Sequence, residues 1–138
     1  MTTTQARSTR QRDRAVVAAA AIATPVLLWA LITYVFGFDI TVPESFGSDA
    51  RTALEPVPVL GTAVAAVLAG WASLALLERF AGARALTIWT AVAVIVFLGT
   101  LPYMPGFTTT ERLLLGLVHL SLALVLVVGM RRTARAGV

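Results

Sequence analysis

The chain has 138 residues, of which 58% are hydrophobic and only 13% are charged, and its mean hydropathy is +0.85. Soluble globular domains carry about 25% charged residues, so this composition excludes that class. The absence of Cys excludes disulfides, thiolate metal sites and Cys nucleophiles, and a single His cannot form a multi-histidine metal site within one chain.

Four apolar segments are long enough to be predicted as transmembrane helices, because a bilayer core about 30 Å thick takes about 20 helical residues. These segments are residues 15–36, 58–77, 85–101 and 113–130, and none contains a charged side chain. The sequence therefore predicts an all-α, polytopic membrane protein. Residues 15–130 form a single four-transmembrane-helix bundle in this prediction, with basic tails at 1–14 and 131–138.

The basic tail at 1–14 precedes an apolar run, as the first region of a secretory signal peptide does. Ala21-Ile22-Ala23 even resembles a cleavage site. It lies only a few residues into an apolar segment that continues to Phe36, whereas a signal peptide ends its apolar region just before the cleavage site. We therefore expect an uncleaved anchor. Pro25 removes a backbone hydrogen bond and is expected to bend this helix.

The outer loop at residues 37–57 is predicted to contain a short surface helix near residues 48–54, after an extended stretch at 39–43. Pro58 suits the first turn of the second helix. Ahead of the fourth helix, residues 108–111 read Thr-Thr-Thr-Glu, which fits a capping box in which Thr and Glu satisfy backbone amides.

The arginines are distributed unevenly between the two sides of the predicted bundle. Nine lie in the two tails and in the loop at 78–84, whereas only Arg51 and Arg112 lie on the other side. The positive-inside rule then places both termini in the cytoplasm, in a multi-pass protein of the inner (plasma) membrane. The pI near 11.1 thus reflects topology. The predicted surroundings are the lipid bilayer, and no nucleic-acid partner is expected.

Small residues spaced four apart are typical of closely packed membrane helices. The second helix has Gly61, Ala65, Ala69 and Ser73 at this spacing, and the first has three alanines at 15, 19 and 23. The first two helices are therefore predicted to form a tight pair, although an Ala-rich sequence also produces such spacings by chance. Whether the protein is a monomer, a homo-oligomer or bound to another membrane protein stays open.

His119 lies near the middle of the fourth span, where ionisable residues face a bundle interior or a cavity. At about the same depth we expect Trp29, with Thr33 and Thr62 slightly nearer the outside. One hypothesis is that these four residues line an outward-facing polar pocket. The interpretation that we favour is a neutral imidazole that joins two helices through a hydrogen bond.

Glu78 and Arg79 end the second helix, and Arg84 begins the third. We interpret Glu78 and Arg79 as an interfacial anchor with a helix-end ion pair, which contributes little when exposed. The alternative is a docking interface for a cytoplasmic partner.

Three short motifs, in this order, resemble a family of small actinobacterial four-helix integral membrane proteins of unknown function. They are Asp-Ile-Thr-Val-Pro at residues 39–43, Ala-Gly-Trp at 69–71 leading to Ala-Leu-Leu-Glu-Arg at 75–79, and Leu-Gly-Leu-Val-His-Leu at 115–120. The resemblance covers residues 15–130 and implies four helices. It implies no activity, cofactor or catalytic residue.

The leading hypothesis for function is a non-enzymatic accessory or structural membrane component that packs against itself or a partner. The alternative is a small transporter or ligand-binding protein with its pocket around His119. A proton-coupled exporter normally needs an intramembrane carboxylate, and none is present. A membrane enzyme would need a paired acid and base or a metal cluster, so we predict neither enzymatic activity nor a cofactor.

Overall fold

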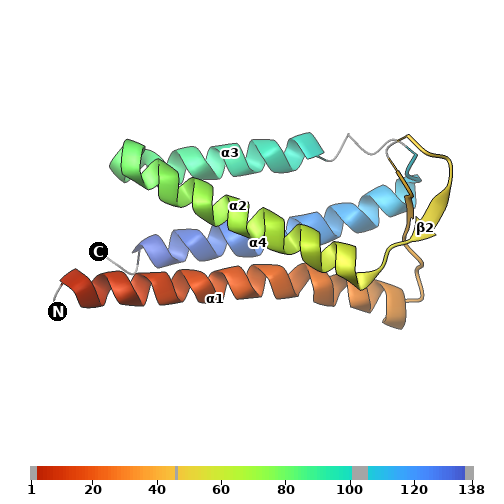
Figure 1. Ribbon diagram of the computed structural model, residues 1–138, viewed down its shortest axis with the longest axis horizontal. Coiled ribbons are helices and arrows are strands. Elements are labelled where there is room, and N and C mark those ends of the chain that lie inside the picture. The colour runs from red at the N-terminus through yellow and green to blue at the C-terminus, as the bar shows by residue number, and fades with distance from the viewer. Residues whose placement is uncertain (1–2, 46, 101–105, 136–138) are drawn as a thin grey trace.

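The computed structural model describes residues 3–45, 47–100 and 106–135, and every structural statement below refers to these residues. It contains four α-helices: α1 (Thr3–Ala30), α2 (Pro56–Ala81), α3 (Ala85–Thr100) and α4 (Thr109–Arg135). The π-helix η1 (Leu31–Val35) continues α1, and the 3-10 turn η2 (Gly82–Arg84) joins α2 to α3. Helix α1 packs against α2 and α4, whereas α3 packs on the far side of α2 and α4 (Figure 1).

Three helical stretches are long and apolar enough to cross a membrane, namely Ser8–Val35, Pro56–Thr100 and Thr109–Ala134. The second stretch consists of α2, η2 and α3, which fold back on each other as antiparallel neighbours (Figure 1). The predicted all-α class is thus confirmed, and by length and composition these three stretches fit the predicted membrane protein. Leu101, the last residue of the predicted third span, lies outside the described residues, as do 1–2 and 136–138.

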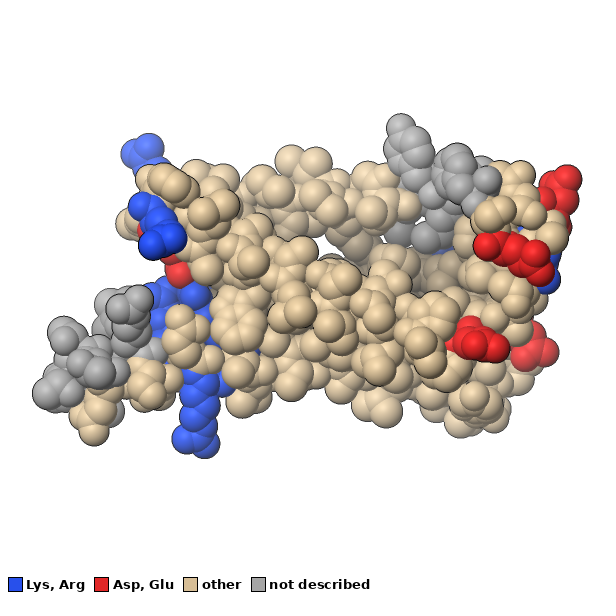
Figure 2. All heavy atoms as spheres, viewed as in Figure 1, with Lys and Arg blue, Asp and Glu red and all other residues tan. Residues whose placement is uncertain are grey.

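The charged residues gather at the two ends of the molecule (Figure 2). Both chain termini lie at one end, where α1 begins at Thr3 and α4 continues to Arg135, so the described parts of both basic tails are helical. We call this the basic end, since Arg side chains dominate it in Figure 2. The opposite end, where most acidic side chains lie, is called the hairpin end.

The hairpin end is formed by two short antiparallel strands, β1 (Thr41–Pro43) and β2 (Arg51–Ala53). The extended stretch predicted at 39–43 therefore contains a strand, but the surface helix predicted near 48–54 is wrong. Its backbone groups bond across the hairpin instead, with the amide of Leu54 donating to the carbonyl of Ile40 at 2.8 Å. The turn between the strands includes Gly47, whose φ of +78° favours glycine.

The closest helix contact joins α1 to α4. The Gly129 position of α4 has no side chain, and Val17 of α1 fills the space where one would lie. Nearby, Ala18 and Ala21 of α1 and Met130 of α4 are buried in the larger of two apolar clusters. Small residues do bring two helices together, as expected for a membrane bundle, but the pair is α1 with α4.

The small-residue faces predicted to join α1 to α2 are exposed. The residues at 15, 19 and 23 of α1 and at 61, 65, 69 and 73 of α2 are all solvent-accessible, and a Cβ added at Gly61 would meet nothing within 4 Å. That prediction is wrong about which face packs. Helices α1 and α2 do contact each other, but the contact includes an ion pair at the basic end.

Candidate functional site

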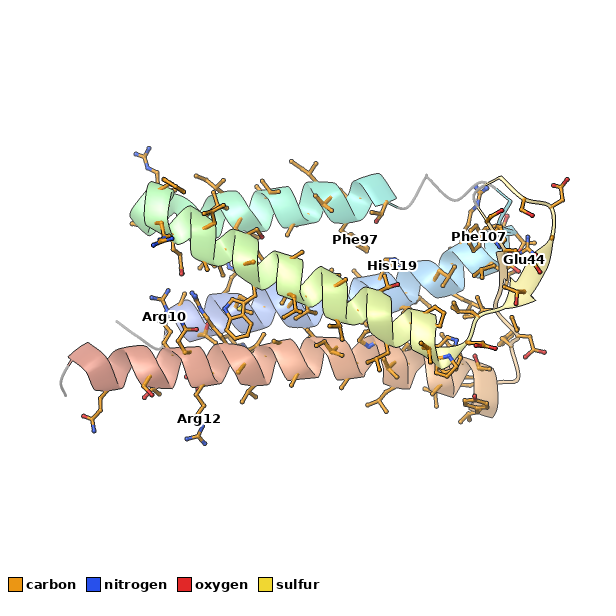
Figure 3. The ribbon with its side chains drawn as sticks, in the orientation of Figure 1. Arg10, Arg12, Glu44, Phe97, Phe107 and His119 are labelled. Carbon is orange, nitrogen blue, oxygen red and sulfur yellow. The ribbon has the colours of Figure 1, made fainter. Side chains whose placement is uncertain are left out.

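His119 lies on the side of α4 that faces α2 and α3 (Figure 3). Its Nδ1 is 2.7 Å from the carbonyl oxygen of Leu115, one turn earlier in the same helix. A carbonyl oxygen only accepts, so Nδ1 donates, and in the neutral ring Nε2 is left as an acceptor. No described residue donates a hydrogen bond to Nε2. The imidazole is thus held by its own helix, and the predicted interhelical hydrogen bond is not formed.

Two cavities meet at His119. One has a volume of about 330 Å³, lies between α1, α2 and α4, and reaches the hairpin end. The other has a volume of about 500 Å³ and lies between α2, α3 and α4. Four residues line both cavities: Ala66, Thr100, His119 and Leu122. Each volume is within the range of about 300–1,000 Å³ typical of small-molecule sites. Figure 2 shows the surface hollowed between α3 and the helices beside it.

The larger cavity exists because α3 is anchored at its first half only. Trp89 is 3% exposed, and its Nε1 donates to the Gly70 carbonyl at 2.9 Å and lies 3.1 Å from the Ser73 hydroxyl. Residues 94–96 and 98–100, in the second half of α3, are exposed. Phe97 projects from this half toward α4 (Figure 3). On the α2 side, the small residues Ala66, Ala69 and Gly70 line the cavity.

The four polar residues predicted to form one pocket lie in two places. His119 and Thr62 line the smaller cavity together. Trp29 and Thr33 do not line either cavity, since Trp29 is 3% exposed and packs in the apolar cluster at the hairpin end. Its ring meets that of Tyr34 edge to face, with centroids 5.7 Å apart. The Trp29 Nε1 and the Thr33 Oγ1 are buried without a partner among the described residues.

The walls of both cavities consist mostly of apolar side chains. The hydroxyl of Thr100 donates to the Phe97 carbonyl at 2.7 Å, and that of Ser73 donates to the Gly70 carbonyl at 2.8 Å. Both hydroxyl protons are therefore engaged within their own helices. Among the described residues that line these walls, His119 is the one that titrates near neutral pH, and its Nε2 is the polar group best placed to bind a ligand. The sequence analysis did not identify Phe97 and Thr100 as cavity residues. They line the larger cavity because the second half of α3 is not packed closely against α2 and α4.

Glu78, predicted to be an interfacial anchor, is bound by two arginines of α1. The guanidinium of Arg14 binds both carboxylate oxygens, at 2.5 and 2.9 Å, and Arg10 binds one of them at 2.7 Å. The side chain of Arg14 is only 2% exposed, and that of Glu78 is 27% exposed. The predicted helix-end pair is therefore replaced by a link between α1 and α2. Arg79 is exposed and lies beside it.

A second polar network fastens the hairpin to α4. Glu111 is bound by Arg51 at 2.5 Å and accepts a hydrogen bond from the Thr41 hydroxyl at 2.7 Å. The Thr108 amide donates to Glu111 at 2.9 Å, and the Glu111 amide lies 3.3 Å from the Thr108 hydroxyl, which confirms the predicted capping box. Leu54, next to β2, lines the smaller cavity, so the hairpin covers that end of it.

The described residues contain no group of three or more His, Cys, Asp or Glu side chains close enough to hold a metal ion. Among known proteins, a model of a protein family described as a family of unknown function (DUF6069) matches residues 5–136. No curated protein and no solved structure matches the chain.

Proposed function

The chain belongs to DUF6069, and because the function of that family is unknown, we propose a function from the geometry of this chain. It is a non-enzymatic integral membrane protein that binds an apolar, membrane-resident molecule in the two cavities that meet at His119. The observation that carries this proposal is the pair of adjoining apolar cavities, one of about 330 Å³ between α1, α2 and α4 and one of about 500 Å³ between α2, α3 and α4.

The proposed topology has four crossings in the inner (plasma) membrane, with both termini in the cytoplasm. The antiparallel α2 and α3 support two separate crossings, and the 16 residues of α3 rise about 24 Å, enough for a nearly upright helix with some local thinning. The gathering of arginines at the end that holds both termini supports the orientation. The actinobacterial source implied by the sequence resemblance is part of the same proposal.

The ligand is expected to combine an apolar body with one hydrogen-bond donor. The aliphatic and aromatic walls favour a ligand with a hydrocarbon body. Such a body is already out of water in the bilayer, so the hydrophobic effect adds little when it enters the cavity. The fit of its shape and its one polar contact therefore decide the affinity. When Nδ1 of His119 donates to the Leu115 carbonyl, Nε2 is able to accept a hydrogen bond, and no described residue donates one to it. A long-chain alcohol or another hydroxyl-bearing lipid would satisfy it.

The absence of a second titratable group on the cavity walls supports a binding role rather than catalysis. General acid–base chemistry needs a positioned partner for the proton that His119 would move. Among the described residues that line the cavities, the other polar side chains are Thr62, Ser73, Thr100 and the Trp89 indole. None of these titrates near neutral pH.

A second candidate function, an accessory or structural membrane component, is favoured by the exposed small residues of α2. Gly61 and Ala65 are exposed on α2, line neither cavity and allow another helix to approach closely. The partner would be a second copy of the chain or another membrane protein. This role predicts a stable complex, whereas ligand binding predicts an adduct of small mass.

Native mass spectrometry of protein extracted with its own lipids tests the proposal. Ala66→Phe fills the junction of the two cavities, and Ala65→Phe is its matched control, because Ala65 is also exposed on α2 but lines neither cavity. We expect a stoichiometric small-molecule adduct on the wild type and on Ala65→Phe, and its loss in Ala66→Phe. A protein complex without such an adduct supports the accessory role, and an adduct that persists in Ala66→Phe refutes the assigned site.

A further inference from the structure

A separate groove lies between α1 and α2 at the basic end and has a volume of about 560 Å³. Its polar rim consists of Arg10, Gln11 and Arg14 from α1 and of Glu78 and Arg79 from α2. We call it the arginine groove. It shares no residue with the cavities at His119, so it is independent of the function proposed above.

The rim of the arginine groove has more positive charge than its carboxylate neutralises. Three guanidinium groups face one carboxylate, which leaves a net charge of +2. The Nε of Arg14, a side chain only 2% exposed, is buried without an acceptor among the described residues. Asp13 does not relieve this excess, because it lines a different groove with Arg132. The guanidinium groups of the rim thus outnumber its carboxylates.

The wall of the groove is apolar. Ala75 and Leu76 of α2 lie below the arginine rim, and Leu76 is 54% exposed. Guanidinium groups bind phosphate oxygens with charge-assisted hydrogen bonds, and basic pockets between membrane helices accept lipid head groups. We infer that the arginine groove binds the phosphate of an anionic lipid in the leaflet at the basic end, with an acyl chain along Leu76.

The test compares lipid-dependent stability of the purified full chain in a non-ionic detergent. Short-chain phosphatidylglycerol is titrated while thermal unfolding is followed, with short-chain phosphatidylcholine and inorganic phosphate as separate arms. Phosphatidylglycerol is expected to raise Tm, and the other two are not. Arg10→Ala and Arg79→Ala are each expected to weaken the apparent affinity about fivefold.

Arg12→Ala is the matched control, because Arg12 lies on the same helix but points away from the bundle, whereas Arg10 points toward α2 (Figure 3). It removes the same charge and is expected to keep the full lipid response. Both test variants leave the pair between Arg14 and Glu78 intact, so they are expected to fold; Tm without lipid verifies this. Arg79→Ala is expected to leave Tm without lipid unchanged, since no described residue hydrogen-bonds to the Arg79 side chain.

Three results would overturn the inference. A wild type whose Tm is unchanged by phosphatidylglycerol has no such site. An equal loss of affinity in Arg12→Ala means that the lipid senses only net charge. A rise in Tm with inorganic phosphate that matches the lipid response assigns the groove to a soluble phosphate compound instead. His119→Phe is expected to leave the phosphatidylglycerol response unchanged. Failure of the lipid site and failure of the proposed ligand site at His119 are therefore distinguishable.

Discussion

The close approach of α1 and α4 at Gly129 makes a sharp prediction for Gly129→Ala. The added Cβ would overlap the Cγ1 atom of Val17 and lie 2.9 Å from its Cγ2 and 3.2 Å from its Cβ. Because Val is branched at Cβ, rotation about χ1 cannot move both γ carbons away. Overpacking of this kind costs about 1–3 kcal/mol. Two atoms under 3.0 Å place this site in the upper half of that range.

The opposing effect is the intrinsic preference of helices for Ala over Gly, about 1 kcal/mol. We therefore expect Gly129→Ala to lower the free energy of unfolding by about 1–2 kcal/mol. Gly61→Ala is the matched control, because its Cβ would meet nothing within 4 Å. That substitution is expected to raise the free energy of unfolding by up to about 1 kcal/mol.

Equilibrium unfolding in mixed micelles, followed by circular dichroism, measures both changes. The double variant Val17→Ala with Gly129→Ala completes a double-mutant cycle, in which the shortened side chain is expected to relieve the overlap and give a favourable coupling of about 1 kcal/mol or more. If Gly129→Ala proves as stable as Gly61→Ala, the contact between α1 and α4 is not as described and the reasoning is refuted.

Three further changes test other contacts. Glu78→Gln leaves the buried Arg14 without a charged partner and is expected to destabilise the fold by about 2–3 kcal/mol in the same unfolding assay, less than for a fully buried pair because Glu78 is 27% exposed; an unchanged stability would contradict this. Trp89→Phe removes the indole donor to α2 and should cost about 1 kcal/mol, and a cost near zero would mean that this bond does not hold α3. Arg51→Ala removes the ion pair between the hairpin and Glu111 and leaves the Thr41 hydroxyl as its link to that carboxylate, so hydrogen exchange at the amides of β1 and β2 should become faster; unchanged protection would show that the ion pair does not stabilise the hairpin.

The helices could be predicted from the sequence because hydropathy is a local property. Each predicted span, as far as it is described, lies within a helical segment or ends one residue beyond it, as Phe36 does after η1. The capping box at residues 108–111 was predictable for the same reason, since both of its hydrogen bonds join residues three apart. The structure adds the helical continuation into both basic tails, which hydropathy alone does not reveal.

The interactions that define the two ends were not predictable, because their partners are far apart in the sequence. Arg14 and Glu78 are 64 residues apart, and Arg51 and Glu111 are 60 apart. The wrong surface helix near 48–54 has the same origin. Its Arg51 side chain is held by Glu111 and by the carbonyl of Gly106, which favours an extended strand beside α4.

The cavity at His119 was predictable in part. An ionisable residue at mid-span indicates a cavity or a polar contact, and the structure places Thr62 and His119 on the wall of the same cavity. Depth alone does not say which face of a helix a residue occupies, however, so Trp29 and Thr33 were grouped with His119 although they lie on the α1 side. The larger cavity depends on how far the second half of α3 lies from α2 and α4, and this distance cannot be predicted from the sequence of α3 alone.

The most direct test of a ligand at His119 uses the fact that the chain contains one His. With 15N-labelled histidine and a tag free of His, an NMR spectrum of the protein in nanodiscs reports this single ring. The account predicts a proton on Nδ1, which faces the Leu115 carbonyl, and an Nε2 resonance that shifts when the co-extracted molecule is removed. A ring protonated at Nε2, or an Nε2 resonance that is the same before and after removal, would contradict it.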